Sequence, residues 1–289
     1  MKTPPHPALS LVITTYNRSD ALLAVLRGLV AQTDRDFEVV VADDGSRPEH
    51  VQAVLQSPEA KQLHLTHVWR PDTGFTLNQN RNTGVAVSNG NYLVFMDGDC
   101  VPEVDFVAQH KLLAKPGCFV NGSRVLLSEK LTAMVISGEQ HIQARGHFFW
   151  LCQTLIGNAN KAWAVLRTNS AHRNKHEVFV WKGIRGCNLA VWKSAFEAVN
   201  GFDESFTGWG HDDADFVLRL HHAGLSRING NLATEVFHLW HPDGTRGRES
   251  VNAATVRERM LTNIVNVPHG YRQCVAKLSS DAVITRLSA

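Results

Sequence analysis

The chain begins its regular pattern with Leu9-Ser-Leu-Val-Ile-Thr14, a mostly apolar stretch that predicts a short buried strand. Three similar runs follow at residues 37–42, 63–69 and 91–96. Helical patterns lie between them: Ser19 can cap a helix with apolar residues at 22, 25, 26, 29 and 30, and residues 48–55 and 77–87 suit two further helices. Strands that alternate with helices predict an α/β fold whose sheet is parallel and whose crossovers are right-handed.

Polar, turn-forming residues follow three of these predicted strands. They occupy positions 14–18 (Thr-Thr-Tyr-Asn-Arg), 43–46 (Asp-Asp-Gly-Ser) and 97–99 (Asp-Gly-Asp). Ligands of open parallel sheets bind at the carboxyl ends of the strands. The three strand ends therefore predict one acidic, hydroxyl-bearing pocket.

Composition excludes several classes of protein. Apolar residues are 44% and charged residues 19% of the 289 residues, which disfavours disorder and fibrous structure. With 29 Lys+Arg against 27 Asp+Glu, the formal charge of +2 is too balanced for a general nucleic-acid binder. No apolar stretch is long enough to span a bilayer and the first seven residues do not resemble a signal peptide, so we expect a cytoplasmic protein. Its five cysteines are odd in number and lack CxxC spacing, which predicts reduced, mostly structural thiols.

The alternation of predicted strands and helices becomes less regular after residue 100. Residues 141–185 carry seven Lys/Arg, four His and one acid, Glu177, with Phe148, Phe149, Trp150 and Trp163 interleaved. This segment is compatible with an insertion whose aromatics are core, or with a surface for nucleic acid, an anionic membrane or a phosphate-bearing acceptor. Residues 233–240 predict another strand, and the tail from Arg248 onward has a helical pattern.

Asp97-Gly-Asp99 can direct one carboxylate at a divalent cation and the other at a sugar hydroxyl, which suits a hard metal that bridges a diphosphate. His238 and His241 lie at the end of the later apolar run. A spacing of three along a strand places two side chains on opposite faces, so we expect at most one of them to face the metal. An oxygen-rich site completed by one imidazole favours Mn²⁺ over Mg²⁺ or zinc.

Residues 208–215 read Gly-Trp-Gly-His-Asp-Asp-Ala-Asp. Glycines beside Trp209 allow close backbone approach and expose an indole that can stack on a sugar ring. The acids that follow would also suit the N-terminus of a helix. Three acids behind an exposed aromatic exceed what capping requires, so we expect one of them to be a general base for a hydroxyl.

These motifs, together with the Arg81-Asn-Thr-Gly84 turn, occur in the order seen in family 2 glycosyltransferases of the GT-A fold, which the sequence resembles. Residues 201–215 resemble the galactosyltransferase-type C-terminal half of chondroitin-polymerase-like and polypeptide-GalNAc-transferase-like enzymes. The likeness covers roughly residues 8 to 245. It implies a GT-A sheet flanked by helices, with a helical insertion and a C-terminal helical tail.

The resemblance implies a role for each motif residue. The expected contacts to the nucleotide-sugar donor are Thr15, Tyr16 and Asn17 around the nucleotide, Asp44 on the uracil imide, Arg81 on the base or diphosphate, Asp97 and Gly98 at the ribose or sugar, and Arg246 or Arg248 on phosphate. The expected acceptor and catalytic residues are Trp209 and Gly210 as the platform, Asp212 on acceptor hydroxyls and Asp213 as base. The expected metal ligands are Asp99 and His241, with His238 as the alternative.

We therefore expect a GT-A domain over residues 1–249, with a nucleotide-binding half at about 8–100, an acceptor-binding half at about 101–249 and a basic, aromatic insertion at about 130–185. Residues 250–289 form the helical tail. The expected reaction is inverting transfer from a nucleotide sugar to a glycan or glycolipid, with Mn²⁺ or Mg²⁺, in surface polysaccharide synthesis. A nucleotidyltransferase or phosphohydrolase that uses the same acids, and a non-catalytic binding protein, are the alternatives. The expected partners exclude nucleic acid and include peripheral contact with the inner face of the plasma membrane.

Overall fold

A computed structural model describes residues 8–163, 166, 175–242 and 247–287. Its strands are β1 (Leu9–Thr15), β2 (Phe37–Asp43), β3 (Leu65–Trp69), β4 (Tyr92–Asp97), β5 (Cys100–Pro102), β6 (Cys118–Asn121), β7 (Ser123–Leu126), β8 (Lys175–His176), β9 (Asn188–Trp192), β10 (Ser226–Asn229), β11 (Glu235–His238) and β12 (Val283–Leu287). Its helices are α1 (Ser19–Val30), α2 (Pro48–Leu55), the short 3₁₀ helix η1 (Ala60–Gln62), α3 (Leu77–Ala86), α4 (Phe106–Leu113), α5 (Glu129–Ser137), α6 (His147–Leu155), α7 (Lys193–Ala198), α8 (Asp212–His222), α9 (Glu249–Arg259) and α10 (Tyr271–Asp281).

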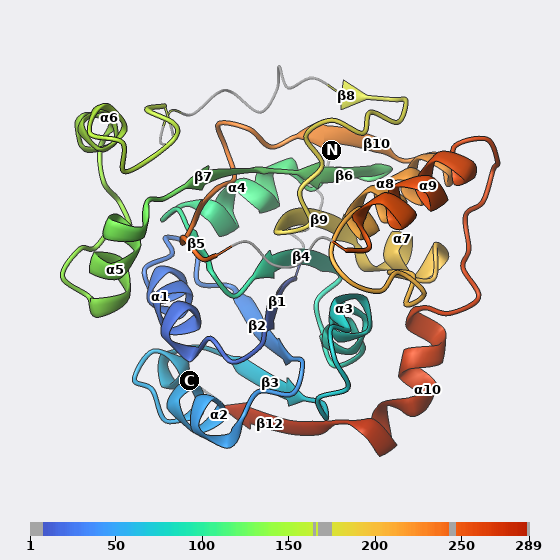
Figure 1. Cartoon of the computed structure of the whole chain (residues 1–289), viewed down its shortest axis with the longest axis horizontal. Coiled ribbons are helices and arrows are strands. Elements are labelled where there is room, and N and C mark those ends of the chain that lie inside the picture. Colours follow the sequence, from blue (N-terminus) through green and yellow to red (C-terminus); the bar gives the residue numbers. More distant parts are fainter. Residues whose placement is uncertain (1–7, 164–165, 167–174, 243–246, 288–289) are drawn as a thin grey trace, which may run out of the picture.

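Two sheets organise the described part of the chain (Figure 1). The larger sheet has nine strands in the order β12-β3-β2-β1-β4-β9-β6-β10-β8, and the smaller has the order β5-β11-β7. Strands β3, β2, β1 and β4 are parallel neighbours, as the alternation of strands and helices predicted. The α/β fold with a parallel central core is therefore confirmed, and antiparallel β9 and β12 extend it.

Alternation of side chains along the central strands creates two hydrophobic layers, one on each face of the sheet. In β1, Leu11 and Ile13 join one apolar cluster with the inner face of α1, whereas Val12 joins the other cluster with α3 and α8. Both faces are covered by helices, which explains why these strands read as continuous apolar runs in the sequence. The carboxyl ends of the parallel strands are left as the edge at which loops meet.

Ser19 is not the N-cap of α1, contrary to the sequence prediction. It is the first residue of the helix, Arg18 occupies the cap position, and no side chain accepts a capping hydrogen bond there. The Ser19 hydroxyl instead hydrogen-bonds His50 Nδ1 at 2.9 Å, so it ties α1 to α2. A tertiary contact has taken the oxygen that a local cap would have used.

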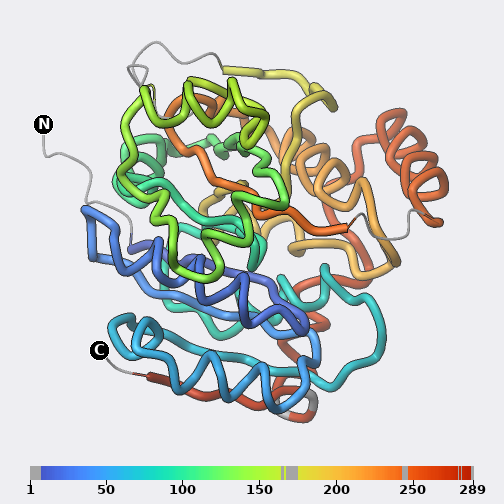
Figure 2. The backbone as a smooth tube through the Cα atoms, turned by 60° about the vertical axis from the view of Figure 1, so that its left-hand side comes forward, coloured from blue at the N-terminus to red at the C-terminus, as the bar shows by residue number. Residues whose placement is uncertain are grey.

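The C-terminal tail contains the expected helices, α9 and α10, and also a strand that was not predicted. Residues 283–287 pair antiparallel with β3, with Val283 opposite Trp69 and Leu287 opposite Leu65. Figure 2 shows this last, red segment running beside the light-blue residues of β3 at one edge of the molecule. Val283 is exposed, so the strand lacks the buried apolar run that revealed the central strands.

The expected insertion holds α5 and α6, and its aromatic residues are divided between core and surface. Trp150 is fully buried and stacks on Phe237 with ring centroids 4.2 Å apart. Phe148 and Trp163 are exposed by 79% and 64%. The segment is thus neither wholly core nor wholly surface.

Gly84 gives a test of how tightly α3 packs on the sheet. A Cβ at this position would lie 2.6 Å from Val12 Cγ1 and 3.2 Å from Ala42 Cβ. We expect Gly84→Val to lower the free energy of unfolding by about 1–3 kcal/mol through overpacking, measured by urea denaturation. Ala133→Val on the exposed face of α5 is the control, and an equal loss in both variants would contradict this account of the packing.

Candidate active site

The ends of β1, β2 and β4 meet at one edge of the sheet, as the sequence predicted. Thr15 pairs with Asp43 across the parallel strands, and Thr14 pairs with Asp97. The Thr14 hydroxyl donates to Asp97 Oδ1 at 3.3 Å. These pairings bring the first acid of the Asp-Gly-Asp motif against the loop that follows β1.

The loop after β1 holds the first three expected donor contacts. Asn17 lies in the left-handed region at φ 50°, and its backbone N–H donates to Ser46 Oγ at 2.8 Å. Tyr16 is 48% exposed and donates its hydroxyl to Asp72 Oδ2 at 2.8 Å. The Thr15 carbonyl accepts from the N–H of Asp44 at 3.0 Å. The structure places these residues together, and their contact with a nucleotide stays a prediction.

Asp44 is held within the protein by neighbouring donors. Its Oδ2 accepts from the backbone N–H of Thr76 at 3.0 Å, and its Oδ1 lies 3.5 Å from Arg70 Nη1. Burial raises the pKa of Asp44 above its ordinary value, although the Thr76 hydrogen bonds and the Arg70 charge act in the opposite direction. Its expected contact with uracil stays a prediction.

Arg81 joins two motifs that are far apart in the sequence. Its side chain is 4% exposed, with Nη1 2.6 Å from Asp212 Oδ2 and Nη2 3.5 Å from Asp97 Oδ1. Its guanidinium carbon lies 4.9 Å from the centre of the Phe202 ring. Burial would lower the pKa of Arg81, but Asp212, Asp97 and Asp213 outweigh this effect and raise it. A contact between Arg81 and the donor stays a prediction.

Asp99 lies in the tight turn between β4 and β5. The N–H of Gly98 donates to Thr14 O at 2.8 Å, and a Cβ at residue 98 would lie 2.9 Å from that oxygen. The turn therefore needs glycine to approach β1 closely. Strand β11 pairs with β5 so that His238 lies opposite Cys100, next to Asp99.

Both histidines face Asp99. His238 Nε2 lies 3.7 Å from Asp99 Oδ1, and His241 Nε2 lies 3.3 Å from Oδ2. The expectation that a spacing of three would place them on opposite faces is wrong, because both imidazoles lie beside Asp99. Strand β11 ends at His238, so the alternation of faces does not extend to His241.

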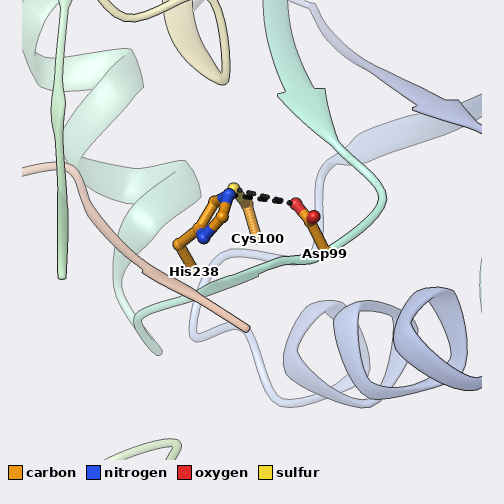
Figure 3. A group of neighbouring side chains, drawn as sticks. All are labelled: Asp99, Cys100 and His238. Carbon is orange, nitrogen blue, oxygen red and sulfur yellow. Dashed lines mark hydrogen bonds and ion pairs between the residues drawn. The ribbon is translucent and has the colours of Figure 1, made fainter. Parts of the chain in front are cut away.

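Cys100 is a third side chain at this position, which sequence analysis assigned only a structural role. One ligand atom each from Asp99, Cys100 and His238 lies within 4.8 Å of the others, and the Cys100 thiol is 3.6 Å from Asp99 Oδ1 (Figure 3). The only local signal was its position directly after the Asp-Gly-Asp motif.

Electrostatic interactions couple the acid to its imidazoles. Burial would raise the pKa of Asp99, but the hydrogen bond from His241 and the charge of His238 bring it below its ordinary value. The same hydrogen bond raises the pKa of His241, while burial lowers that of His238. Asp99 thus has one imidazole beside each of its carboxylate oxygens.

The Trp209 loop precedes α8 and turns sharply. Gly208, Gly210 and His211 have φ angles of 70°, 109° and 66°. Asn252 of α9 fixes the loop by donating to Gly210 O at 2.9 Å. Trp209 is left 44% exposed, as an acceptor platform requires, and its contact with a sugar stays a prediction.

Asp213 lies in the first turn of α8, beside the salt-bridged Asp212. Its Oδ2 accepts from the N–H of Gly186 at 2.9 Å, and its Oδ1 accepts from the N–H of Ala214 at 2.8 Å. Burial, followed by the charge of Asp212, raises the pKa of Asp213 above its ordinary value, although Arg81 opposes the shift. A raised pKa suits a proton acceptor. The third acid, Asp215, is buried and salt-bridged, so its role is structural.

Sequence analysis missed Gly186 as part of this site. A Cβ there would lie 2.9 Å from Arg81 Nη2 and 3.3 Å from Asp213 Cβ, so only glycine fits beside both side chains without displacement. Of the two expected phosphate ligands, Arg246 lies outside the described residues. Arg248 is exposed, and its side chain packs against Gly208.

All five cysteines lie in the described part of the chain and none is disulfide-bonded, as expected. Across residues 8–163, 166, 175–242 and 247–287, no helix combines the length and the apolar character that crossing a membrane demands.

Known proteins share this sequence pattern and fold. The model of glycosyl transferase family 2 matches residues 10–167, and that of the N-terminal domain of galactosyltransferase matches residues 167–242. Chondroitin synthase of Escherichia coli is 26% identical over 92% of this chain and 39% of its own length. Validoxylamine A glucosyltransferase of Streptomyces hygroscopicus subsp. jinggangensis is 29% identical over 76% of this chain and 52% of its own length.

Two solved structures share the fold at low sequence identity. The mannosyltransferase PcManGT of Pyrobaculum calidifontis, in complex with GDP-Man and Mn²⁺, has a TM-score of 0.54 at 20% identity, covering 90% of this chain and 66% of its own. Staphylococcus aureus TarS 1–349, in complex with UDP, has a TM-score of 0.58 at 14% identity, covering 94% and 70%.

The chain belongs to glycosyl transferase family 2, since that family's model matches more than half of it. The expected family and GT-A fold are therefore confirmed. The chain spans about two fifths to one half of the length of the two curated relatives described above.

Removal of the Arg81 charge tests the link between the motifs. Because Arg81→Met leaves Asp212, whose side chain is only 13% exposed, without its cation, we expect the free energy of unfolding to fall by about 3–5 kcal/mol, measured by urea denaturation. Arg47→Met removes an exposed pair with Glu49 and should change it by less than about 1 kcal/mol. Similar effects in the two variants would contradict a structural role for the buried cation.

Proposed function

We propose that the protein is a metal-dependent, inverting glycosyltransferase that moves a sugar from a UDP-sugar to a hydroxyl of a glycan or glycolipid. The observation that carries the proposal is the Arg81 link, because it joins Asp97 on the expected donor side to Asp212, the neighbour of the expected base. The neighbours that hold GDP-Man with Mn²⁺ and UDP support a nucleotide-sugar donor and a divalent ion. The relatives named chondroitin synthase support a polysaccharide product.

We assign the donor to residues 8–100 and the acceptor to residues 101–249, with 250–289 as a supporting tail. The tail supports the donor half through α10, where Thr83 Oγ1 lies 3.2 Å from Cys274 Sγ, and through β12 on the sheet edge. Surface polysaccharide synthesis, such as that of lipopolysaccharide or capsule, at the cytoplasmic face of the membrane is the setting that we propose for this reaction.

Asp99, His238 and His241 fit a divalent cation by their chemistry. A carboxylate with an imidazole beside each of its oxygens is a donor set that Mn²⁺ accepts, and Mg²⁺, which prefers oxygen ligands, is the weaker candidate. When bound, the cation supplies positive charge to the diphosphate that leaves the sugar. Asp97, one residue from the ligand Asp99, is directed toward Arg81, so its role is to hold the donor side in place.

Asp213 is the proposed general base. It accepts the proton of the acceptor hydroxyl while that oxygen bonds the anomeric carbon and the bond from this carbon to the diphosphate breaks. Two backbone N–H groups fix its carboxylate, and burial followed by the charge of Asp212 raises its pKa above its ordinary value. Asp212 is neutralised by Arg81, so it is poorly placed to act as a nucleophile. One base and direct displacement invert the configuration of the sugar.

We expect Asp213→Asn to lower the rate of sugar transfer by at least about 10²-fold while UDP binding, measured by calorimetry, stays nearly unchanged. The amide keeps the shape of the side chain but accepts no proton. Asp36→Asn, at a side chain that is 86% exposed, is the control and should retain full activity. Equal loss of transfer and of UDP binding would refute the assignment of the base.

Metal removal tests the donor set. EDTA should abolish sugar transfer, and added Mn²⁺ should restore it. The variant His241→Ala should bind Mn²⁺ at least about tenfold more weakly, as measured by electron paramagnetic resonance. Because Asp99 raises the pKa of His241, protons compete with the metal, and Mn²⁺ affinity should rise as pH increases through that pKa. His269→Ala, at an exposed position, is the control. Full turnover without metal would remove these ligands from the mechanism.

A further inference from the structure

The outward face of α6 is apolar. Phe148, Leu151 and Leu155 recur at intervals of three and four, so they lie along one side of the helix. Their exposed fractions are 79%, 44% and 76%, and Ile156 directly after the helix is exposed by 66%. Figure 1 places α6 at the periphery of the molecule, beyond α5 and β7. We call Phe148, Leu151, Leu155 and Ile156 the α6 face.

The inner side of the same helix fixes this orientation. Trp150 is fully buried, and its ring stacks on Phe237 of β11 with planes inclined by 8°. Turning α6 to bury the α6 face would expose Trp150 and break this stack. The apolar residues are therefore held outward by packing on the opposite side of the helix.

The surrounding segment is strongly basic. Residues 140–176 contain no Asp or Glu, and their Lys and Arg residues are Arg145, Lys161, Arg167, Arg173 and Lys175. Arg145 lies just before α6, is exposed, and places its guanidinium 5.4 Å from the Phe149 ring. An apolar helix face within a basic segment matches the composition of helices that lie in the interface of anionic membranes.

We propose that the α6 face docks on the surface of an anionic lipid bilayer. Helices of this type bury their apolar residues at the boundary of headgroups and acyl chains while nearby Lys and Arg contact anionic headgroups. The charge of the segment and the outward Phe and Leu side chains fit this partner. The docking does not depend on the proposed function. Only the idea that docking brings the site to a membrane-bound acceptor rests on that function.

A second copy of the chain is a poorer occupant. A two-fold symmetric contact brings the same patch of both subunits together, so Arg145 beside each α6 face would approach its copy, and residues 140–163 contain no acid to neutralise it. The α6 face is also confined to a three-turn helix, whereas specific interfaces bury about 800 Å² on each partner. Charge and size both favour a lipid surface.

Docking at α6 would affect the site through β11. Phe237, on which Trp150 stacks, precedes His238 in the strand, and His238 O accepts from the N–H of Leu127 at 3.0 Å. Leu127 itself bridges to Ala159, just beyond α6. The helix and the strand that carries His238 are thus one packed unit, so docking would hold the site close to the lipid headgroups.

Vesicle co-sedimentation of the full chain tests the proposal. We expect vesicles of phosphatidylcholine with one quarter phosphatidylglycerol to bind the chain at least about tenfold more tightly than phosphatidylcholine alone, with binding weakened by salt. The triple variant Phe148→Ser, Leu151→Ser, Leu155→Ser should lose at least about tenfold in vesicle affinity. Arg145→Glu should weaken binding to anionic vesicles only.

The matched control changes three exposed apolar residues elsewhere, Leu112→Ser, Val251→Ser and Leu261→Ser, and should bind vesicles like the unmodified chain. Urea denaturation should show that the α6 variant unfolds at the same midpoint, because its substituted side chains face solvent. Phe148→Trp supplies a direct reporter, since brominated lipids should quench its additional fluorescence. This variant keeps the proposal testable if the triple variant fails to fold.

Equal binding to neutral and anionic vesicles, or unchanged binding by the folded triple variant, would overturn the proposal. A dimer in analytical ultracentrifugation that dissociates in the triple variant would assign the α6 face to a second copy and would also overturn it. Vesicle binding without sugar transfer would contradict the proposed function but not the docking. Sugar transfer to a water-soluble acceptor without vesicle binding would contradict the docking but not the proposed function.

Discussion

The site depends on one buried cation. Arg81 lies on α3, Asp97 ends β4 and Asp212 begins α8, so a single guanidinium fixes the sheet edge relative to the helix that carries Asp213. A buried guanidinium is tolerated only when carboxylates compensate the loss of water, and the acids in turn need the cation. Gly186 completes the arrangement because its missing side chain leaves room for Arg81. The charges of two distant motifs are therefore structurally interdependent.

Two acids of the candidate site, Asp99 and Asp213, have opposite electrostatic surroundings. Asp99 faces two imidazoles, which keep its pKa low and its carboxylate charged. Asp213 is half-buried beside the carboxylate of Asp212, and desolvation followed by that charge raises its pKa, which strengthens it as a proton acceptor. A separation of pKa values of this kind would let one site hold a cation at one carboxylate and move a proton at another, as we propose for Asp99 and Asp213. The division of roles follows from burial and neighbours, since both residues are aspartate.

The sequence predicted what depends on local pattern and missed what depends on distant contacts. Strands β1, β2 and β4 were visible because burial on both faces requires unbroken apolar runs. The pairing of Arg81 with Asp212 spans 131 residues and leaves no local signal, and family resemblance gave their expected roles without this contact. The direction of His241 could not be predicted, because it depends on where β11 ends. The edge strand β12 is short and partly exposed, so its pattern was weak.

Strand β12 also affects how readily the sheet can pair edge to edge with the sheet of another molecule. By pairing along β3, it occupies backbone groups of β3 that would otherwise stand unpaired at the edge of the sheet. Within β12, Thr285 is partly exposed and Arg286 is exposed. A charged side chain on an edge strand discourages the pairing of a further strand. Strand β12 therefore protects the edge of β3 and presents a charged side chain at the new edge of the sheet.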